Sequence, residues 1–327
     1  MLLSIAIPTY NRASYLDRCL NSITRQINGI QYQVELLVVD NASTDNTYEI
    51  VEKYINQGYN IKYSKGETNK GIDFNILQCY HLSTAKYVVA FGDDDILYDG
   101  VLQCLEKLLV DDYGIIYIEN NNITNDDFNS IKVQESGFHF KSFDSSFKTL
   151  NTINYYITYT SGCIINKKYF DVNFDYVGCF VALTPCILKA ILNSKKNACV
   201  STKCIGYQTE NSGGYKLIDV FAYNLNEVML KEIKDKRIIS CINTHLLLGF
   251  FPIWMILFKQ NKNNYKHFFI ANEDPVKKLR IAYNGSFLFW FAIMPIKLLP
   301  IKIAKQYVLF LYLIKKGYTF FNNKFIS

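Results

Sequence analysis

The first third of the chain alternates between short apolar runs and segments whose apolar residues recur every three or four positions. Four apolar runs predict buried β-strands: residues 2–7, 34–39, 61–64 and 87–91. Three amphipathic segments predict helices: residues 15–26, 48–54 and 73–81. Ser14 is the expected N-cap of the first helix. This alternation predicts an α/β fold with a mostly parallel, Rossmann-like sheet flanked by helices on both faces.

Polar side chains follow the predicted strands at the points where they end. Residues 9–12 follow the first strand, Asp40 follows the second, and Gly92 with three consecutive acids, 93–95, follows the fourth. In an open α/β sheet, the carboxyl ends of the strands line the crevice where ligands bind. Adjacent carboxylates repel each other, and a divalent cation with oxygen ligands would remove that cost. The alternative is a solvated turn before a helix at 101–109, with Asp99 as its cap.

The crevice predicts a nucleotide ligand, but the sequence lacks two common phosphate-binding loops. A dinucleotide-binding Gly-x-Gly-x-x-Gly would follow the first strand, and residues 7–12 contain no glycine. The sequence also has no Gly-x-x-x-x-Gly-Lys-Ser/Thr loop. A Rossmann dehydrogenase and a P-loop enzyme are therefore disfavoured, and metal and side chains must neutralise most of the charge of a bound phosphate.

The middle of the chain is more polar and loop-like. Residues 155–159 and 161–165 predict two further strands. Residues 207–215 predict a loop with aromatic ends, which either closes over the ligands or only connects two elements. The nine cysteines are odd in number and form no Cys-x-x-Cys pair, so most are expected to be small core residues in a reducing compartment.

The C-terminal region changes character after about residue 216. Its uncharged runs at 246–258, 286–294 and 307–314 are shorter than the roughly 18–20 apolar residues of a spanning helix. The net charge is +6, the last acid is Asp274, and lysines recur among Leu, Ile and Phe up to the C-terminus. This pattern favours helices lying in a membrane interface; the alternative is a helical core packed on the preceding α/β domain. The N-terminal residues 1–7 lack the features of a signal peptide, so we expect a cytoplasmic protein.

Four segments taken together resemble the successive motifs of family 2 glycosyltransferases of the GT-A fold: residues 5–12, 38–47, 69–71 and 91–95. The resemblance implies a GT-A catalytic domain at 1–215, with 1–110 binding the nucleotide sugar and 111–215 on the acceptor side. A helical, hydrophobic and basic region at 216–327 would follow as a membrane-associating appendage. The family also implies Mg²⁺ or Mn²⁺, a nucleotide-sugar donor and transfer with inversion at the anomeric carbon.

Carried over residue by residue, the resemblance implies that four residues flank the nucleoside: Pro8, Thr9, Tyr10 and Arg12. Asp40 would hydrogen-bond the base, and Asn41 stands where the family often has a second acid. Asp93 and Asp95 would form the D-x-D pair. Asp95 is expected to ligate the metal, and Asp93 or Asp94 to contact ribose or metal.

Some of these residues have plainer structural roles available. Asp40 caps the following helix in the alternative interpretation. Lys70 contacts a phosphate or is an ordinary surface lysine, and Asn69 contacts the donor or forms a tight turn with Gly71.

An inverting transfer also needs a general base for the acceptor hydroxyl. In the family this is an acid well beyond the D-x-D motif, often in a Glu-Asp pair before a helix. The matching segment here, residues 171–185, has no such pair. Asp175 is the first candidate, followed by Asp171 and Glu210, and the alternative for Asp175 is a surface turn.

The sequence therefore predicts a metal-dependent hexosyl- or deoxyhexosyltransferase that uses a nucleotide sugar. Its expected acceptor is a lipid-diphosphate-linked oligosaccharide of O-antigen or capsule type, in lipopolysaccharide-like biosynthesis. It would be peripheral on the inner face of the cell membrane, and no nucleic-acid partner is expected. Two alternatives are a non-catalytic nucleotide-sugar or membrane-binding module, and a nucleotidyltransferase, which would be expected to carry a glycine-rich basic loop after its first strand.

Overall fold

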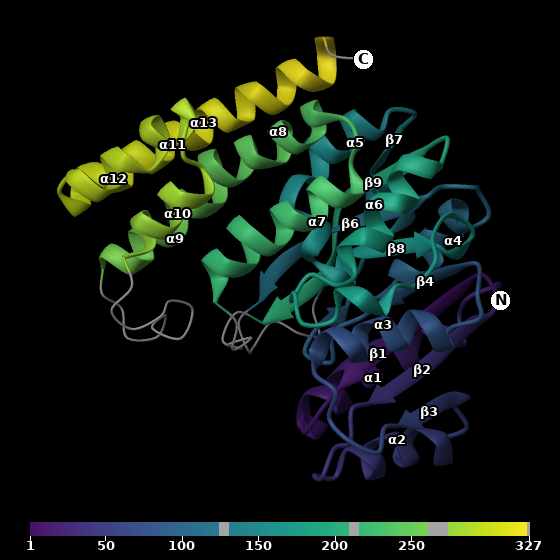
Figure 1. The fold of residues 1–327 in the computed structure, drawn as a ribbon. Coiled ribbons are helices and arrows are strands. Elements are labelled where there is room, and N and C mark those ends of the chain that lie inside the picture. Colours follow the sequence, from purple (N-terminus) through teal and green to yellow (C-terminus); the bar gives the residue numbers. More distant parts are fainter. Residues whose placement is uncertain (124–130, 209–215, 261–273, 326–327) are drawn as a thin grey trace. The chain divides into compact units, whose positions relative to one another are not determined.

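The computed structural model describes residues 1–123, 131–208, 216–260 and 274–325. The chain divides into two compact units (Figure 1). Unit 1 comprises Met1–Ser146, Tyr156–Gly178 and Ala182–Asn211. Unit 2 comprises Phe147–Tyr155, Cys179–Val181 and Ser212–Ser327, so two short segments from the middle of the sequence belong with the C-terminal helices.

The described part of unit 1 is built on a nine-stranded sheet of order β3-β2-β1-β4-β8-β6-β9-β5, with β7 paired to β9. Its first four strands pair in parallel, as expected. They are β1 (Leu3–Thr9), β2 (Val34–Asp40), β3 (Ile61–Lys65) and β4 (Tyr87–Ala90). The helices between them are α1 (Ala13–Ile27), α2 (Thr47–Asn56) and α3 (Ile72–Leu82).

The second half of the sheet adds antiparallel pairs, so the sheet as a whole is mixed. β8 runs antiparallel to both β4 and β6, whereas β9 is parallel to β6 and antiparallel to β5 and β7. The strands are β5 (Ile96–Leu97), β6 (Ile115–Ile123), β7 (Phe140–Phe143), β8 (Cys163–Asn166) and β9 (Asn197–Gln208). The helices of this half are α4 (Val101–Leu109) and α6 (Thr184–Asn193).

Two local expectations are wrong. Residues 155–159 form no strand: a 3₁₀ helix covers Asn154–Thr158, and Asn154 starts it with a left-handed φ of 44°. Strand propensity therefore yields here to a turn. Ser14 is not the cap of α1, which begins one residue earlier, at Ala13. The Ala13 N–H donates to Asp45 Oδ2 at 3.1 Å, so a side chain from another loop satisfies this helix end.

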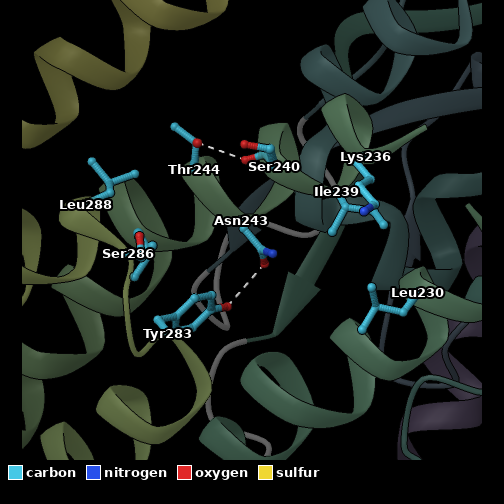
Figure 2. Close-up of a pocket in the computed structure, with 10 residues that line it drawn as sticks. Leu230, Lys236, Ile239, Ser240, Asn243, Thr244, Tyr283, Ser286 and Leu288 are labelled. Atoms are coloured by element: carbon cyan, nitrogen blue, oxygen red, sulfur yellow. Dashed lines mark hydrogen bonds between the residues drawn. The ribbon is translucent and has the colours of Figure 1, made fainter. Parts of the chain in front are cut away.

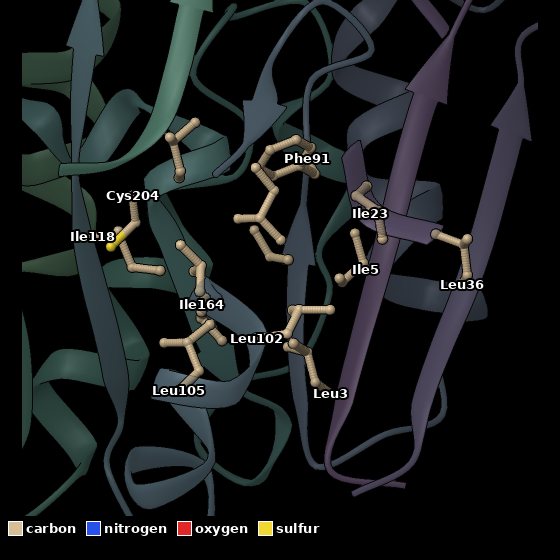
Figure 3. Close-up of a cluster of buried hydrophobic side chains, with 14 of the residues drawn as sticks. Leu3, Ile5, Ile23, Leu36, Phe91, Leu102, Leu105, Ile118, Ile164 and Cys204 are labelled. Carbon is tan, nitrogen blue, oxygen red and sulfur yellow. The ribbon is translucent and has the colours of Figure 1, made fainter. Parts of the chain in front are cut away.

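The core of unit 1 lies between the sheet, α1 and α4 (Figure 3). Leu3 and Ile5 on β1 and Leu36 on β2 alternate with residues that face the other side of the sheet, as the period of two requires. Leu102 of α4 and Ile23 of α1 cover them. Eight of the nine cysteines are buried, which confirms their expected role as small core residues. This packing fixes the strand ends from which the polar loops project.

Unit 2 is helical in its described residues. Its helices are α5 (Ser146–Ile153), α7 (Leu225–Glu232), α8 (Lys236–His245), α9 (Phe251–Lys259), α10 (Pro275–Ala282), α11 (Phe287–Ala292), α12 (Met294–Leu298) and α13 (Ile301–Phe325). A π-helical turn, Leu246–Phe250, joins α8 to α9 in one 24-residue helix. Among the described residues, only this helix is long and apolar enough to cross a membrane, and 56% of its most apolar window is buried inside the protein.

A lysine is partly buried where α13 packs on this long helix. Lys315 reaches across Gly249, where an added Cβ would lie 2.9 Å from the lysine Cδ and Nζ atoms. Its ammonium lies 4.8 Å from the Tyr155 ring centroid and 3.3 Å from the Tyr155 hydroxyl. Burial lowers the pKa of Lys315 to about 8. Because no acid contributes to this shift, the charged form destabilises the folded state.

We therefore expect Lys315→Met to raise the thermal midpoint, by about 2–4 °C for each 1 kcal/mol gained. Between pH 8 and 10.5 the unfolded chain keeps the lysine proton and the folded chain loses it, so wild-type stability rises with pH in this window. The variant loses that rise. Thermal unfolding at pH 7.5 and pH 10 measures both effects, with the exposed neighbour Lys316→Met as control. Equal pH dependence in wild type and variant would contradict this account.

Candidate active site

The loops expected to bind a ligand meet at one edge of the sheet. Thr9 and Asp40 are register partners at the ends of β1 and β2, and the Asn41 N–H donates to the Thr9 carbonyl at 3.0 Å. The Phe91 N–H donates to the Ala6 carbonyl at 2.8 Å, so the acidic turn after β4 begins beside the end of β1. The parallel pairing of β2, β1 and β4 thus brings together polar segments that are far apart in the sequence.

The acid triplet, residues 93–95, is not a solvated turn. Asp93 and Asp95 are only 3% and 5% exposed. Asp93 accepts from the Thr9 hydroxyl at 2.8 Å and from Arg12 Nη1 at 2.8 Å. The other Arg12 nitrogen, Nη2, reaches Asp94 at 3.2 Å. Residues of the first loop therefore contact the first two acids of the triplet directly.

Asp95 is contacted by two residues of the segment that precedes β8. The Ser161 hydroxyl donates to Asp95 Oδ2, and the Tyr159 hydroxyl lies 3.3 Å from the same oxygen. Ser161 also accepts from the Gly92 N–H at 2.9 Å. A Cβ on Gly162 would lie 2.6 Å from the Tyr159 ring, so the small residue is required for this approach. The three consecutive small residues 161–163 are the feature of the sequence that could have indicated this close contact.

The site carries uncompensated negative charge. Burial raises the pKa of Asp95 to about 8, and the neighbouring Asp94 carboxylate adds to the effect. Burial also raises the pKa of Asp93 to about 6, although the Arg12 guanidinium acts in the opposite direction. The single arginine thus neutralises the triplet only in part, and a further cation would stabilise its ionised form.

Asp40 has a structural role that the sequence did not indicate. It does not cap α2, whose N-cap is Asn46. Its two carboxylate oxygens accept from the Ser43 N–H at 2.7 Å and from the Tyr63 hydroxyl at 2.5 Å, and the side chain is buried. Asp40 therefore fixes the loop that follows β2, and a contact with a base stays a prediction.

A hydrogen-bond network joins this loop to the next one along the sheet. The Asn41 amide donates to Asn69 Oδ1 at 2.8 Å and accepts from the Lys70 N–H at 3.0 Å. An acid at position 41 would lose the first of these bonds, because a carboxylate has no N–H to donate. The Lys70 ammonium lies over the Phe74 ring, 4.7 Å from its centroid. The network keeps residues 69–71 beside the end of β2.

The candidate general base is not joined to this cluster. Asp175 is exposed on a 3₁₀ turn, Phe174–Tyr176, and its N–H donates to Asn173 Oδ1 at 2.9 Å. Across the described ranges, no hydrogen bond or ion pair links it to the acid triplet. Asp171 is also exposed, and Glu210 lies outside the described residues. The role of Asp175 stays a prediction.

The carboxylates at this site fit a hard divalent cation whose remaining ligands are supplied by substrate phosphates and water. Within the part of the chain that the structure describes, no three His, Cys, Asp or Glu side chains are grouped to hold a metal. Mg²⁺, however, is commonly bound through one or two carboxylates together with substrate phosphates and water. Asp93 and Asp95, buried at the sheet edge with raised pKa values, supply two such carboxylates.

A separate hollow in unit 2 has a different character. A cavity of about 450 Å³ lies among α7, α8 and the start of α11, lined on its apolar side by Leu230, Ile239, Leu247 and Leu288 (Figure 2). Its polar side chains are largely satisfied within the protein: the Tyr283 hydroxyl donates to Asn243 Oδ1 at 3.2 Å, and the Thr244 hydroxyl donates to the Ser240 carbonyl at 2.8 Å. Among the described residues that line it there is no acid, so they include no carboxylate that could ligate a metal.

Known sequences resemble parts of this chain. Abequosyltransferase RfbV of Salmonella typhimurium is 31% identical over 194 residues, which span 54% of this chain and 57% of RfbV. Poly(ribitol-phosphate) β-N-acetylglucosaminyltransferase TarS of Staphylococcus aureus is 45% identical over 71 residues, or 22% of this chain and 12% of TarS. The matches therefore span less than two thirds of the length of each relative.

Solved structures share the fold over nearly the whole chain. The crystal structure of S. aureus TarS 1–349 covers 97% of this chain and 91% of its own, with a TM-score of 0.57 at 17% identity. The mannosyltransferase PcManGT from Pyrobaculum calidifontis, solved with GDP-Man and Mn²⁺, covers 99% and 87%, with a TM-score of 0.53 at 16% identity. These likenesses identify the fold as GT-A, as predicted.

The family comparison agrees with the motifs. The family model described as Glycosyl transferase family 2 matches residues 4–174, more than half of the chain, and this range contains the strand ends, the acid triplet and Ser161. On this match the protein is a glycosyltransferase that belongs to family 2.

Proposed function

We propose that this glycosyltransferase uses a divalent metal to transfer a sugar, with inversion, from a nucleotide sugar to a lipid-linked glycan of the O-antigen or capsule type. The observation that supports it most is the buried acid triplet at the carboxyl edge of the sheet, beside Thr9 and Arg12. Two relatives solved with a nucleotide sugar, TarS with UDP-GlcNAc and PcManGT with GDP-Man, support the donor class.

In this proposal the donor lies across the loop edge of unit 1. Its nucleoside would contact Pro8, Thr9, Tyr10, Arg12 and Asp40, and its phosphates would lie near Asn69 and Lys70. Asp95 and Asp93 would ligate Mg²⁺ or Mn²⁺, and Asp94 would contact ribose or metal. The cation would stabilise the negative charge that develops on the departing nucleoside diphosphate.

The chain's own residues would position that cation and the donor. Thr9 and Arg12 fix the orientation of Asp93, and Ser161 with Tyr159 fix Asp95, so both carboxylates are restrained before a ligand arrives. Such restraint reduces the reorganisation needed to reach the transition state. Asp175 would accept the proton of the acceptor hydroxyl as it attacks the anomeric carbon.

The acceptor and the location are proposed from the C-terminal region and from the relatives' names. An abequosyltransferase and a poly(ribitol-phosphate) glycosyltransferase act, by name, on a deoxysugar and on a bacterial polymer. A lipid-diphosphate-linked acceptor would lie at the inner face of the cell membrane, which agrees with a C-terminal region that carries no acid after Asp274.

The donor class is testable with a panel of UDP-, GDP-, CDP- and dTDP-sugars. With Mn²⁺ we expect slow hydrolysis of at least one donor, and chelator should abolish it, because water replaces the missing acceptor. Release of the nucleoside diphosphate is the readout. No hydrolysis of any donor, together with unchanged nucleotide binding by Asp95→Ala, would exclude the proposed catalytic site and favour a binding module.

Metal binding at the triplet predicts a pH dependence that does not require turnover. Because Asp95 keeps its proton up to about pH 8, a binding cation must displace it. Mn²⁺ affinity, measured by titration calorimetry with nucleotide present, should therefore rise by about tenfold per pH unit from pH 6 to 8 and then level off. Affinity that is independent of pH would contradict metal binding by Asp95.

The same acid should limit the stability of the metal-free protein. The folded chain keeps the Asp95 proton that the unfolded chain has already lost, so wild-type stability falls as pH rises from about 4 to 8. Asp95→Asn should be more stable than wild type at pH 8, by more than about 1 kcal/mol, and should lose Mn²⁺ binding. Glu67→Gln, at an exposed acid outside the triplet, is the control. A less stable Asp95→Asn at pH 8 would contradict this account.

The general-base role of Asp175 is tested separately. Asp175→Asn should lower kcat for transfer by about 10²–10⁴-fold and leave donor KM nearly unchanged, since the residue would act only on the acceptor proton. Asp144→Asn, at an exposed acid that is not a candidate base, is the control. If kcat falls less than threefold in Asp175→Asn, the base lies elsewhere.

A further inference from the structure

The helix α13 exposes a second apolar face that the packing of unit 2 does not use. α13 packs against the π-helical turn and α9 (Figure 1). Its buried side chains, Ala304, Leu311 and Asn322, share one face of the helix, and Asn322 donates to Asn151 Oδ1 of α5 at 3.3 Å. On the opposite face, Leu309, Leu313 and Phe320 are each 66% exposed. At about 100° per residue, these three positions lie within roughly 40° of one another, so they form one stripe.

Lysines border the same stripe. Lys302, Lys305, Lys316 and Lys324 are exposed, and their helical positions lie within roughly 60° of Leu309. The sequence contains no Asp or Glu from residue 275 to its end. The outer face of α13 is therefore apolar and cationic together, without the acids that usually balance lysines on a soluble surface.

The composition of this face indicates what covers it. Large exposed apolar patches mark interaction sites, and lysines that border them can lay their stems along the apolar surface with the ammonium groups in water. That arrangement fits the boundary between acyl chains and anionic headgroups of a bilayer. A protein partner would have to supply all the acids that compensate for these lysines. A second copy of this face cannot, because it carries no Asp or Glu. The five lysines in 25 residues also disfavour α13 as a spanning helix.

We propose that the outer face of α13, defined by Leu309, Leu313, Phe320 and the four bordering lysines, docks the enzyme in the plane of an anionic bilayer. This inference rests on the proposed function, because docking on a bilayer would give the enzyme access to a lipid-linked acceptor. It identifies the surface and the lipid chemistry that the proposed function leaves open: apolar side chains enter the acyl boundary, and lysines pair with headgroup phosphates.

Flotation of the full chain with vesicles tests this surface. Wild type should bind vesicles of phosphatidylcholine with phosphatidylglycerol, bind phosphatidylcholine alone at least tenfold more weakly, and lose binding to the mixed vesicles in high salt. The apolar variant, Leu309→Ser with Leu313→Ser and Phe320→Ser, and the charge variant, Lys302→Gln with Lys305→Gln and Lys316→Gln, should each reduce binding at least tenfold. Val110→Ser with Ile55→Ser removes exposed apolar side chains from unit 1 and should bind as wild type does.

Thermal unfolding and nucleotide binding show whether each variant is folded, since none of the substituted side chains lies in the core. The proposal is overturned if wild type binds no vesicles, if both α13 variants bind as wild type does, or if the apolar variant only converts a dimer to a monomer. Donor hydrolysis in the absence of vesicles reports on the proposed function independently. If the α13 variants still hydrolyse the donor but no longer bind vesicles, the docking surface is supported. If wild type binds vesicles but hydrolyses no donor, only the proposed function is rejected.

Discussion

Two carboxylates buried at the end of one strand are the constraint around which the candidate active site is arranged. Asp93 and Asp95 are almost inaccessible to solvent, and one arginine neutralises their triplet only in part. A buried charge without a full partner destabilises the fold unless protons, cations or hydrogen bonds compensate for it. Under the proposed function these carboxylates would bind a cation, and the stability lost to their burial is of the kind common at functional sites.

The surrounding loops explain how the carboxylates stay in place. The first loop contacts Asp93 through Thr9 and Arg12, and the segment at 159–161 contacts Asp95. Asp40 and Asn41 fix the neighbouring loops by side-chain hydrogen bonds to residues up to 30 positions away in the sequence. The residues proposed to contact the nucleotide are therefore also joined to one another by hydrogen bonds. Substituting one of them is expected to change the geometry of the loops as well as nucleotide binding.

Sequence patterns predicted much of this arrangement because its causes are local. Apolar runs ending in polar residues identified β1 to β4, and the four motifs identified the GT-A fold. The patterns did not predict the antiparallel pairs in the second half of the sheet, because non-local pairing decides them. Tyr159 was expected in a strand. In the structure it lies between two 3₁₀ helices, Asn154–Thr158 and Thr160–Gly162, and its hydroxyl contacts Asp95. A strand prediction could not indicate this contact. The apolar and basic composition of α13 was visible in the sequence, but its exposed stripe required the packing of unit 2.

The central claim is that the acids at 93–95 bind a cation together with the donor's diphosphate. Anomalous X-ray diffraction from crystals soaked with Mn²⁺ and a nucleoside diphosphate tests it most directly. The account predicts one manganese peak at about 2.0–2.3 Å from an oxygen of Asp95 or Asp93, bridging to the phosphates. A nucleotide bound at the sheet edge without a manganese peak at these acids, or manganese bound at other residues, would contradict it.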